Sequence, residues 1–182
     1  SLAVSAWART TGRAVLWFSL GPEDSSLASL ASLLSYGLSR MFAGDPGSPL
    51  PEGPDSGAVG VTDQAPRYLA ALLARQVRER LSDRELVLVL DDYHLCDGEA
   101  NNSFILELSN QSSSRMKILI SGRSDPGLPI SRLRAQNRID EIRIDDLRFS
   151  AVDLAAFLAA HVDRPVPEEL QSLIDRKTEG WP

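Results

Sequence analysis

The feature that most constrains this chain is an unbroken apolar run at residues 86–90, which leads directly into two adjacent carboxylates, Asp91 and Asp92. Such a run is typical of a strand that is buried on both faces of a parallel sheet. Carboxylates beside it are costly to bury unless they are paired, bind a metal or lie at the water-exposed end of the strand. Because ligands of open α/β sheets bind beyond the carboxyl ends of the strands, the two residues indicate an Mg²⁺-nucleotide site. This is the Walker B pattern.

The rest of the chain alternates predicted strands with predicted helices. Apolar runs predict further strands at residues 14–20 and 117–121, and a more exposed one at residues 139–144, where apolar and charged residues alternate. This order predicts an α/β fold with a parallel sheet. Residues 44–62 are rich in glycine and proline and are predicted to form a loop.

Helical patterns fill the intervals between the strands. One begins at Ser25 or Ser26 and runs to about Phe42, and a weaker one covers residues 99–110, where Asn101 and Asn102 dilute the apolar stripe. Near the carboxyl end, Ser150 and Asp153 form a capping-box pattern. Pro167 can occupy the first position of a last helix, which Gly180 ends.

Composition excludes several classes of function. A net charge of −6 argues against a surface dominated by nucleic-acid binding. No apolar run is long enough to cross a bilayer, and the single cysteine, Cys96, cannot form an internal disulfide, which together favour the cytoplasm. With only two histidines, His94 and His161, and no Cys/His cluster, a zinc site is improbable.

Each polar residue near the strand ends has a functional and a structural interpretation. In the functional one, Asp91 binds Mg²⁺ through water and Asp92 orients or deprotonates the attacking water. The alternatives are a turn in which aspartate is simply favoured, or a hydrolase with paired carboxylates. Arg123, just beyond the next strand, can reach a γ-phosphate, or it is a surface arginine in a turn. His94 can touch phosphate, but packing at the strand end is the more frequent role.

No G-x-x-x-x-G-K-[ST] phosphate loop occurs anywhere in the chain. A Walker B strand without such a cradle is expected to bind nucleotide poorly.

Several motifs follow one another in an order that resembles the ATPase domain of the large MalT-like LuxR-type transcription regulators, a branch of the STAND signalling NTPases. They are Trp7, residues 15–20 (VLWFSL), 88–94 (LVLDDYH), 121–129 (SGRSDPGLP), Leu133-Arg134, 146–150 (DLRFS) and 178–182 (TEGWP).

The resemblance implies a fragment. It places Ser1 at the hydroxyl position of Walker A, where it ligates Mg²⁺, with the Walker A lysine immediately before it, and Pro182 near the nucleotide. It implies a three-layer P-loop NTPase core at residues 1–149 that lacks its first strand and Walker A loop, followed at 150–182 by the start of a helical region. The missing strand belongs between the strands at 117–121 and 139–144, which either close over the gap or keep unpaired edges.

Two hypotheses of different classes follow. In the first, the chain is part of an ATP-dependent switch in a transcription regulator, with ATP and Mg²⁺ as cofactors, slow hydrolysis that resets it, and negligible activity in the fragment. Its partners are ATP, an unidentified inducer and further copies of itself, and DNA only through an absent C-terminal helix-turn-helix. In the second, it is a nucleotide-free scaffold that acts by protein contact. Gly122, inserted where the family has Ser-Arg, favours the second, whereas the presence of both acids favours the first.

Overall fold

The computed structural model describes residues 2–42, 64–81, 84–112, 114–162 and 164–180. The chain packs as two compact units, Ser1–Leu128 and Pro129–Pro182. The glycine- and proline-rich loop predicted at 44–62 lies outside the described residues, and the domain boundary predicted after residue 149 stays a prediction. No helix in the described ranges has the length and apolar character needed to span a membrane.

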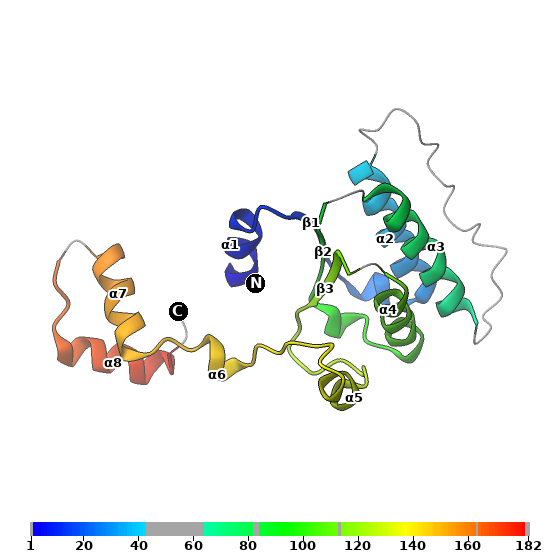
Figure 1. The fold of residues 1–182 in the computed structure, drawn as a ribbon. Helices are drawn as coiled ribbons and strands as arrows, with labels where there is room; N and C mark the ends of the chain where they lie inside the picture. The colour runs from blue at the N-terminus through cyan, green and yellow to red at the C-terminus, as the bar shows by residue number, and fades with distance from the viewer. Residues whose placement is uncertain (1, 43–63, 82–83, 113, 163, 181–182) are drawn as a thin grey trace. The chain divides into compact units, whose positions relative to one another are not determined.

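A three-stranded parallel sheet organises the first unit, in the order β1-β2-β3 (Figure 1). β1 is Ala14–Ser19, β2 is Leu86–Asp91 and β3 is Met116–Ile120. In this register Leu88 lies between Leu16 of β1 and Ile118 of β3. The predicted α/β class and parallel sheet are therefore confirmed.

The central strand is buried on both faces, as its sequence predicted. Leu86, Leu88 and Leu90 belong to the main hydrophobic core. Val87 and Val89, which alternate with them and point to the opposite face, are 2% and 0% exposed. Asp91, the last residue of β2, is the first polar position after this run and is only partly buried.

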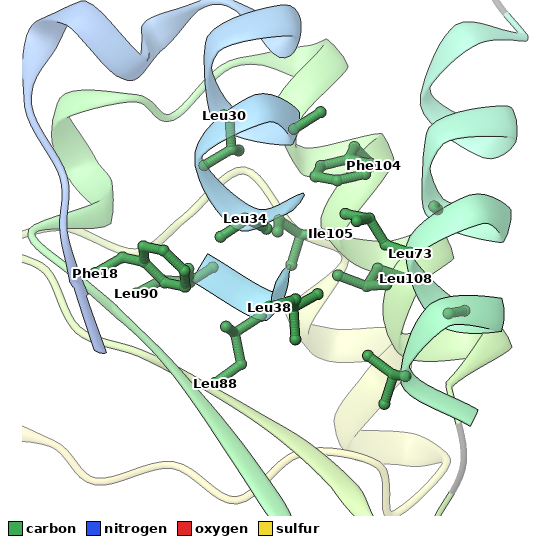
Figure 2. Packing of buried hydrophobic residues seen from close by; sticks show 14 of the residues in the cluster. Phe18, Leu30, Leu34, Leu38, Leu73, Leu88, Leu90, Phe104, Ile105 and Leu108 are labelled. Carbon is green, nitrogen blue, oxygen red and sulfur yellow. The ribbon is translucent and has the colours of Figure 1, made fainter. Parts of the chain in front are cut away.

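Three helices lie together on one side of the sheet in Figure 1. They are α2 (Leu27–Phe42), α3 (Ala65–Arg80) and α4 (Glu99–Gln111). Ser26 caps α2, since its Oγ accepts the Ser29 N–H at 3.1 Å. Figure 2 shows side chains of α2 between those of the strands and those of α3 and α4. The weak apolar pattern at 99–110 thus forms a full helix because tertiary packing supports it.

Short elements complete the first unit. Helix α1 (Leu2–Thr10) precedes β1, and single turns η1 (Pro22–Ser25) and η2 (Tyr93–Leu95) follow β1 and β2. Both turns lie at the carboxyl ends of their strands, which is the edge of the sheet where the candidate site was predicted.

The second unit is helical. It contains α5 (Ile130–Ala135), α6 (Ile144–Leu147), α7 (Ala151–His161) and α8 (Glu168–Thr178). The capping box predicted at Ser150 is present, with the Asp153 N–H bound to the Ser150 Oγ at 3.2 Å. Pro167 is the residue before α8 rather than its first position. Gly180 follows the end of α8 with φ +76°, and a Cβ there would approach the Phe149 carbonyl oxygen at 3.0 Å, so glycine is required.

The strand predicted at 139–144 does not form. Residues 139–143 have no regular structure, Ile144 begins α6, and Ile142 is 73% exposed. A strand needs a neighbouring backbone for its hydrogen bonds, and within the described residues the outer edges of β1 and β3 are unpaired. Glu141 instead binds the side chains of Arg134 and Arg143. No other described strand lies beside β3, so the position inferred for the missing strand stays a prediction, although its second expected neighbour at 139–144 is not a strand.

Replacement of Gly37 by alanine should destabilise the protein, although the same change usually stabilises a helix interior. The new Cβ would lie 2.3 Å from Cζ of Phe18, inside the core. We expect a loss of about 1–3 kcal/mol in the free energy of urea unfolding. Ser32→Ala at an exposed position of α2 is the control and should change stability by less than about 0.5 kcal/mol. Unchanged or increased stability of Gly37→Ala would contradict the packing described.

Glu141 should make the second unit sensitive to acid. Hydrogen bonds from Arg134 and Arg143 lower the pKa of its carboxyl to about 2. Because the folded-state pKa is lowered, this contribution to stability is complete above the ordinary glutamate pKa and is lost as pH falls toward 2. Thermal unfolding between pH 5 and pH 2.5 should therefore depend less on pH in Glu141→Gln than in the unaltered protein. Parallel profiles for the two proteins would contradict this role.

Candidate functional site

The candidate site begins at the carboxyl end of β2. Asp91 ends the strand, and its Oδ1 accepts a hydrogen bond from the Ser121 hydroxyl just after β3. The backbone of Ser121 continues the sheet, because its N–H donates to the Leu90 carbonyl at 3.0 Å and its carbonyl accepts the Tyr93 N–H at 2.9 Å. The Asp91 carboxylate is thus held by the neighbouring strand, and such outer contacts orient metal ligands.

Asp92 begins the turn that follows. Its φ of 58° and ψ of 34° lie in the left-handed region, which aspartate tolerates better than most residues. The turn η2 starts here, so the alternation of side chains along β2 ends at Asp91. The side chain of Asp92 is 52% exposed, and its Oδ1 lies 3.8 Å from Nδ1 of His94. Asp92 is therefore open to solvent, as a residue that positions water must be.

His94 is packed rather than free. Its side chain is 18% exposed, and its Nδ1 is buried without a hydrogen-bond partner among the described residues. A Cβ at Gly122 would lie 3.6 Å from Cβ of His94, an ordinary contact distance. Gly122 is therefore not required by crowding, and the loop after β3 passes directly over His94.

Arg123 lies in an exposed bend two residues beyond Ser121. Its guanidinium forms no hydrogen bond or ion pair with another described residue, which leaves it available for a ligand. Ser1 and Pro182, the other two predicted site residues, lie outside the described residues.

A hydrogen-bonded chain runs from the buried Tyr93, in the turn after β2, through α4 to the exposed Asp97. Tyr93 is 1% exposed, and its hydroxyl donates to Oδ1 of Asn102 at 3.0 Å. Burial, together with nearby Cys96 and Asp97, raises the pKa of Tyr93 above its usual range, so the hydroxyl stays protonated and remains a donor. Nδ2 of Asn102 then donates to Oδ1 of Asp97 at 2.7 Å.

The same aspartate reaches the loop after β3. Oδ1 of Asp97 accepts the Gly127 N–H at 3.1 Å. A Cβ at Gly127 would lie 2.6 Å from Nδ2 of Asn102, so any larger residue there would displace the Asn102 amide. The loop at 121–127 is therefore attached at both ends, at Ser121 to β2 and at Gly127 to the start of α4.

Asn101 attaches the third loop. It is 1% exposed, and its Nδ2 donates to the Ser25 carbonyl at 3.0 Å and to the Cys96 carbonyl at 2.8 Å. Ser25 belongs to η1, after β1. The neighbouring residues Asn101 and Asn102 thus connect the loops that follow all three strands. The sequence analysis interpreted both residues as weakening the helix. Two adjacent amides in the first turn of a helix could have indicated side chains that bind neighbouring loops.

The described residues form neither a complete metal site nor a reactive thiol. Within the described ranges, no three Asp, Glu, His or Cys side chains gather as a metal site. An ion at Asp91 would need water and phosphate oxygens as further ligands, which is the usual manner of Mg²⁺. Burial raises the pKa of the Cys96 thiol to about 11, which disfavours the reactive thiolate, as expected for a packing residue.

Tyr93→Phe should weaken the fold without altering the shape of its core. The variant leaves Oδ1 of Asn102 buried without its donor, which costs about 1–3 kcal/mol. Urea denaturation should show a lower midpoint with an unchanged m value. Tyr68→Phe, at a tyrosine that is 56% exposed on α3, is the matched control and should leave the midpoint unchanged. Equal midpoints for Tyr93→Phe and the unaltered protein would show that the hydroxyl carries no such interaction.

Comparison with known proteins identifies distant relatives. No protein-family model matches the chain. The chain is 25% identical over 174 residues to "Serine/threonine-protein kinase PknK" of Mycobacterium tuberculosis (strain CDC 1551 / Oshkosh), covering 93% of this chain and 15% of that protein. It is 26% identical over 99 residues to "HTH-type transcriptional regulator MalT" of Yersinia pestis (strain Pestoides F), covering 54% of this chain and 11% of that protein.

The chain thus spans only a small part of the length of these relatives. The matches support a distant relationship to MalT-like proteins and, with the α/β parallel sheet, suggest a regulatory domain of NTPase type.

Proposed function

We propose that this chain is part of the ATP-binding switch domain of a larger transcription regulator of the MalT-like LuxR type. The observation that carries the proposal is Asp91, a carboxylate at the carboxyl end of a central parallel strand, held by the Ser121 hydroxyl of the neighbouring strand. The two relatives bear names of different activities, a kinase and a transcriptional regulator. A segment that is similar to parts of both proteins is better explained as a regulatory module than as the part that carries either named activity.

The positions of Asp91, Asp92 and Arg123 at or beyond the strand ends support the proposed roles. Asp91 holds Mg²⁺ through water, and Ser121 keeps that carboxylate oriented. Asp92, exposed in the turn, positions the attacking water, and Arg123 contacts the γ-phosphate. Ser1 completes the metal ligands and Pro182 lies near the nucleotide. The proposed core is a three-layer P-loop NTPase core.

The domain would act as a slow ATPase and a switch in the cytoplasm. ATP and an inducer together favour an open state that associates with further copies, and hydrolysis resets it. ATP can shift this equilibrium only if it binds the two states with different affinity. DNA is contacted by a helix-turn-helix outside this chain, which agrees with its net charge of −6.

A nucleotide-free scaffold is the second candidate. It is favoured by the Asp91 carboxylate, which already has the Ser121 hydroxyl as a partner without any metal. A parallel sheet of this kind can persist as a platform for protein contacts after nucleotide binding is lost.

Substitution of each acid separately distinguishes the proposed roles. In the complete protein that carries this segment, Asp91→Asn should weaken Mg²⁺-dependent ATP binding by about tenfold or more. Asp92→Asn should retain binding within about twofold but slow single-turnover hydrolysis by about 100-fold. Binding is measured by titration with ATP in Mg²⁺ and in EDTA.

Glu79→Gln, which removes the same charge from an exposed position of α3, is the control and should change neither quantity. If the unaltered protein binds no ATP and Asp91→Asn leaves target-gene regulation intact, the switch proposal is wrong and the scaffold remains.

A further inference from the structure

Three hydrogen bonds connect the turn after β2 with the far end of the loop that carries Arg123. They run from Tyr93 to Asn102, from Asn102 to Asp97 and from the Gly127 N–H to Asp97. The near end of the same loop is attached through Ser121 to both Leu90 and Tyr93. Arg123 lies between these two attachments and has no described partner of its own.

We infer that Asn102, acting through Asp97 and Gly127, is a positioning residue that sets where Arg123 meets the terminal phosphate of the nucleotide. The inference rests on the proposed function, which supplies the phosphate. A long side chain on a short exposed bend would lose conformational entropy on binding, and fixing the bend at both ends lowers that loss. The network thus favours ATP over ADP without itself touching either.

The structure explains why this role needs asparagine at 102 and glycine at 127. The Asn102 amide uses its oxygen for Tyr93 and its nitrogen for Asp97, so an aspartate would keep the first bond and lose the second. Asn102 is 9% exposed, so its bond to Tyr93 is shielded from water, whereas its bond to the exposed Asp97 is only partly buried. The 2.6 Å approach at Gly127 leaves no room for a Cβ unless the amide moves.

The test compares ATP with ADP in the complete protein, in Mg²⁺. Asn102→Ala and Gly127→Ala should each lower the ratio of the ADP Kd to the ATP Kd by about fivefold, while the Kd for ADP stays within about twofold. Gly122→Ala is the matched control in the same loop, because its Cβ would meet only ordinary contacts at 3.5 Å and beyond. It should leave the ratio unchanged.

Two double variants show through which residues the effect passes. Gly127→Ala should add nothing to Asn102→Ala, because the amide that the Cβ displaces is already gone. Asn102→Ala should likewise add nothing to Arg123→Ala. A merely structural role for Asn102 would lower the affinity for both nucleotides together and would add to Arg123→Ala. Either result, or an unchanged ratio in the single variants, would overturn the inference.

Amide hydrogen exchange separates failure of this inference from failure of the proposed function. In the nucleotide-free protein, Asn102→Ala and Gly127→Ala should accelerate exchange at residues 122–126, with β3 amides as the internal reference. If the unaltered protein binds neither nucleotide, the proposed function fails and the positioning of Arg123 fails with it, whether or not exchange changes. If ATP binds and exchange at 122–126 does not respond, only the positioning role is overturned.

Discussion

Burial of β2 on both faces is the constraint on which the rest of the first unit depends. With Val87 and Val89 covered on one side and Leu86, Leu88 and Leu90 in the core on the other, the first place where a charge can stand is the end of the strand. Asp91 stands there, and the chain turns at Asp92 immediately afterward. The polar chemistry of this unit is therefore concentrated at the carboxyl edge of its sheet.

The first turn of α4 completes that edge. Asn101 and Asn102 satisfy backbone and side-chain groups of loops that have no ladder partners of their own. One amide oxygen, Oδ1 of Asn101, is buried without a hydrogen-bond partner among the described residues. The side-chain oxygen and nitrogen of Asn102, in contrast, both form hydrogen bonds. Helix α4 therefore has two structural roles, since its apolar face packs in the core and the amides in its first turn hold the loops.

How far the sequence could predict this structure depended on how local each signal was. The apolar run at 86–90 is sufficient by itself to indicate a buried strand, and Ser150 and Asp153 cap the helix through contacts between neighbouring residues. Both predictions were therefore confirmed. The alternation of apolar and charged residues at 139–144 was not sufficient to form a strand, because a strand also needs a neighbouring strand edge. Glu141 instead forms ion pairs with Arg134 and Arg143. The roles of Asn102 and Gly127 could not be inferred, because their contact joins residues 25 positions apart, in two elements brought together only by the fold.

The register of β1 against β2 has a consequence for synthesis of the chain. Ala14 pairs with Leu86, and Leu86 also pairs with Met116 across a much shorter segment that holds η2 and α4. During translation roughly 70 further residues are synthesised after β1 before β2 is available to pair with it. This takes on the order of 4–14 s at ribosomal rates of ~5–20 residues per second. Through that interval the apolar side chains of β1, Trp17 and Phe18 among them, have no sheet to join. The βαβ unit β2-α4-β3 is therefore the template onto which β1 docks.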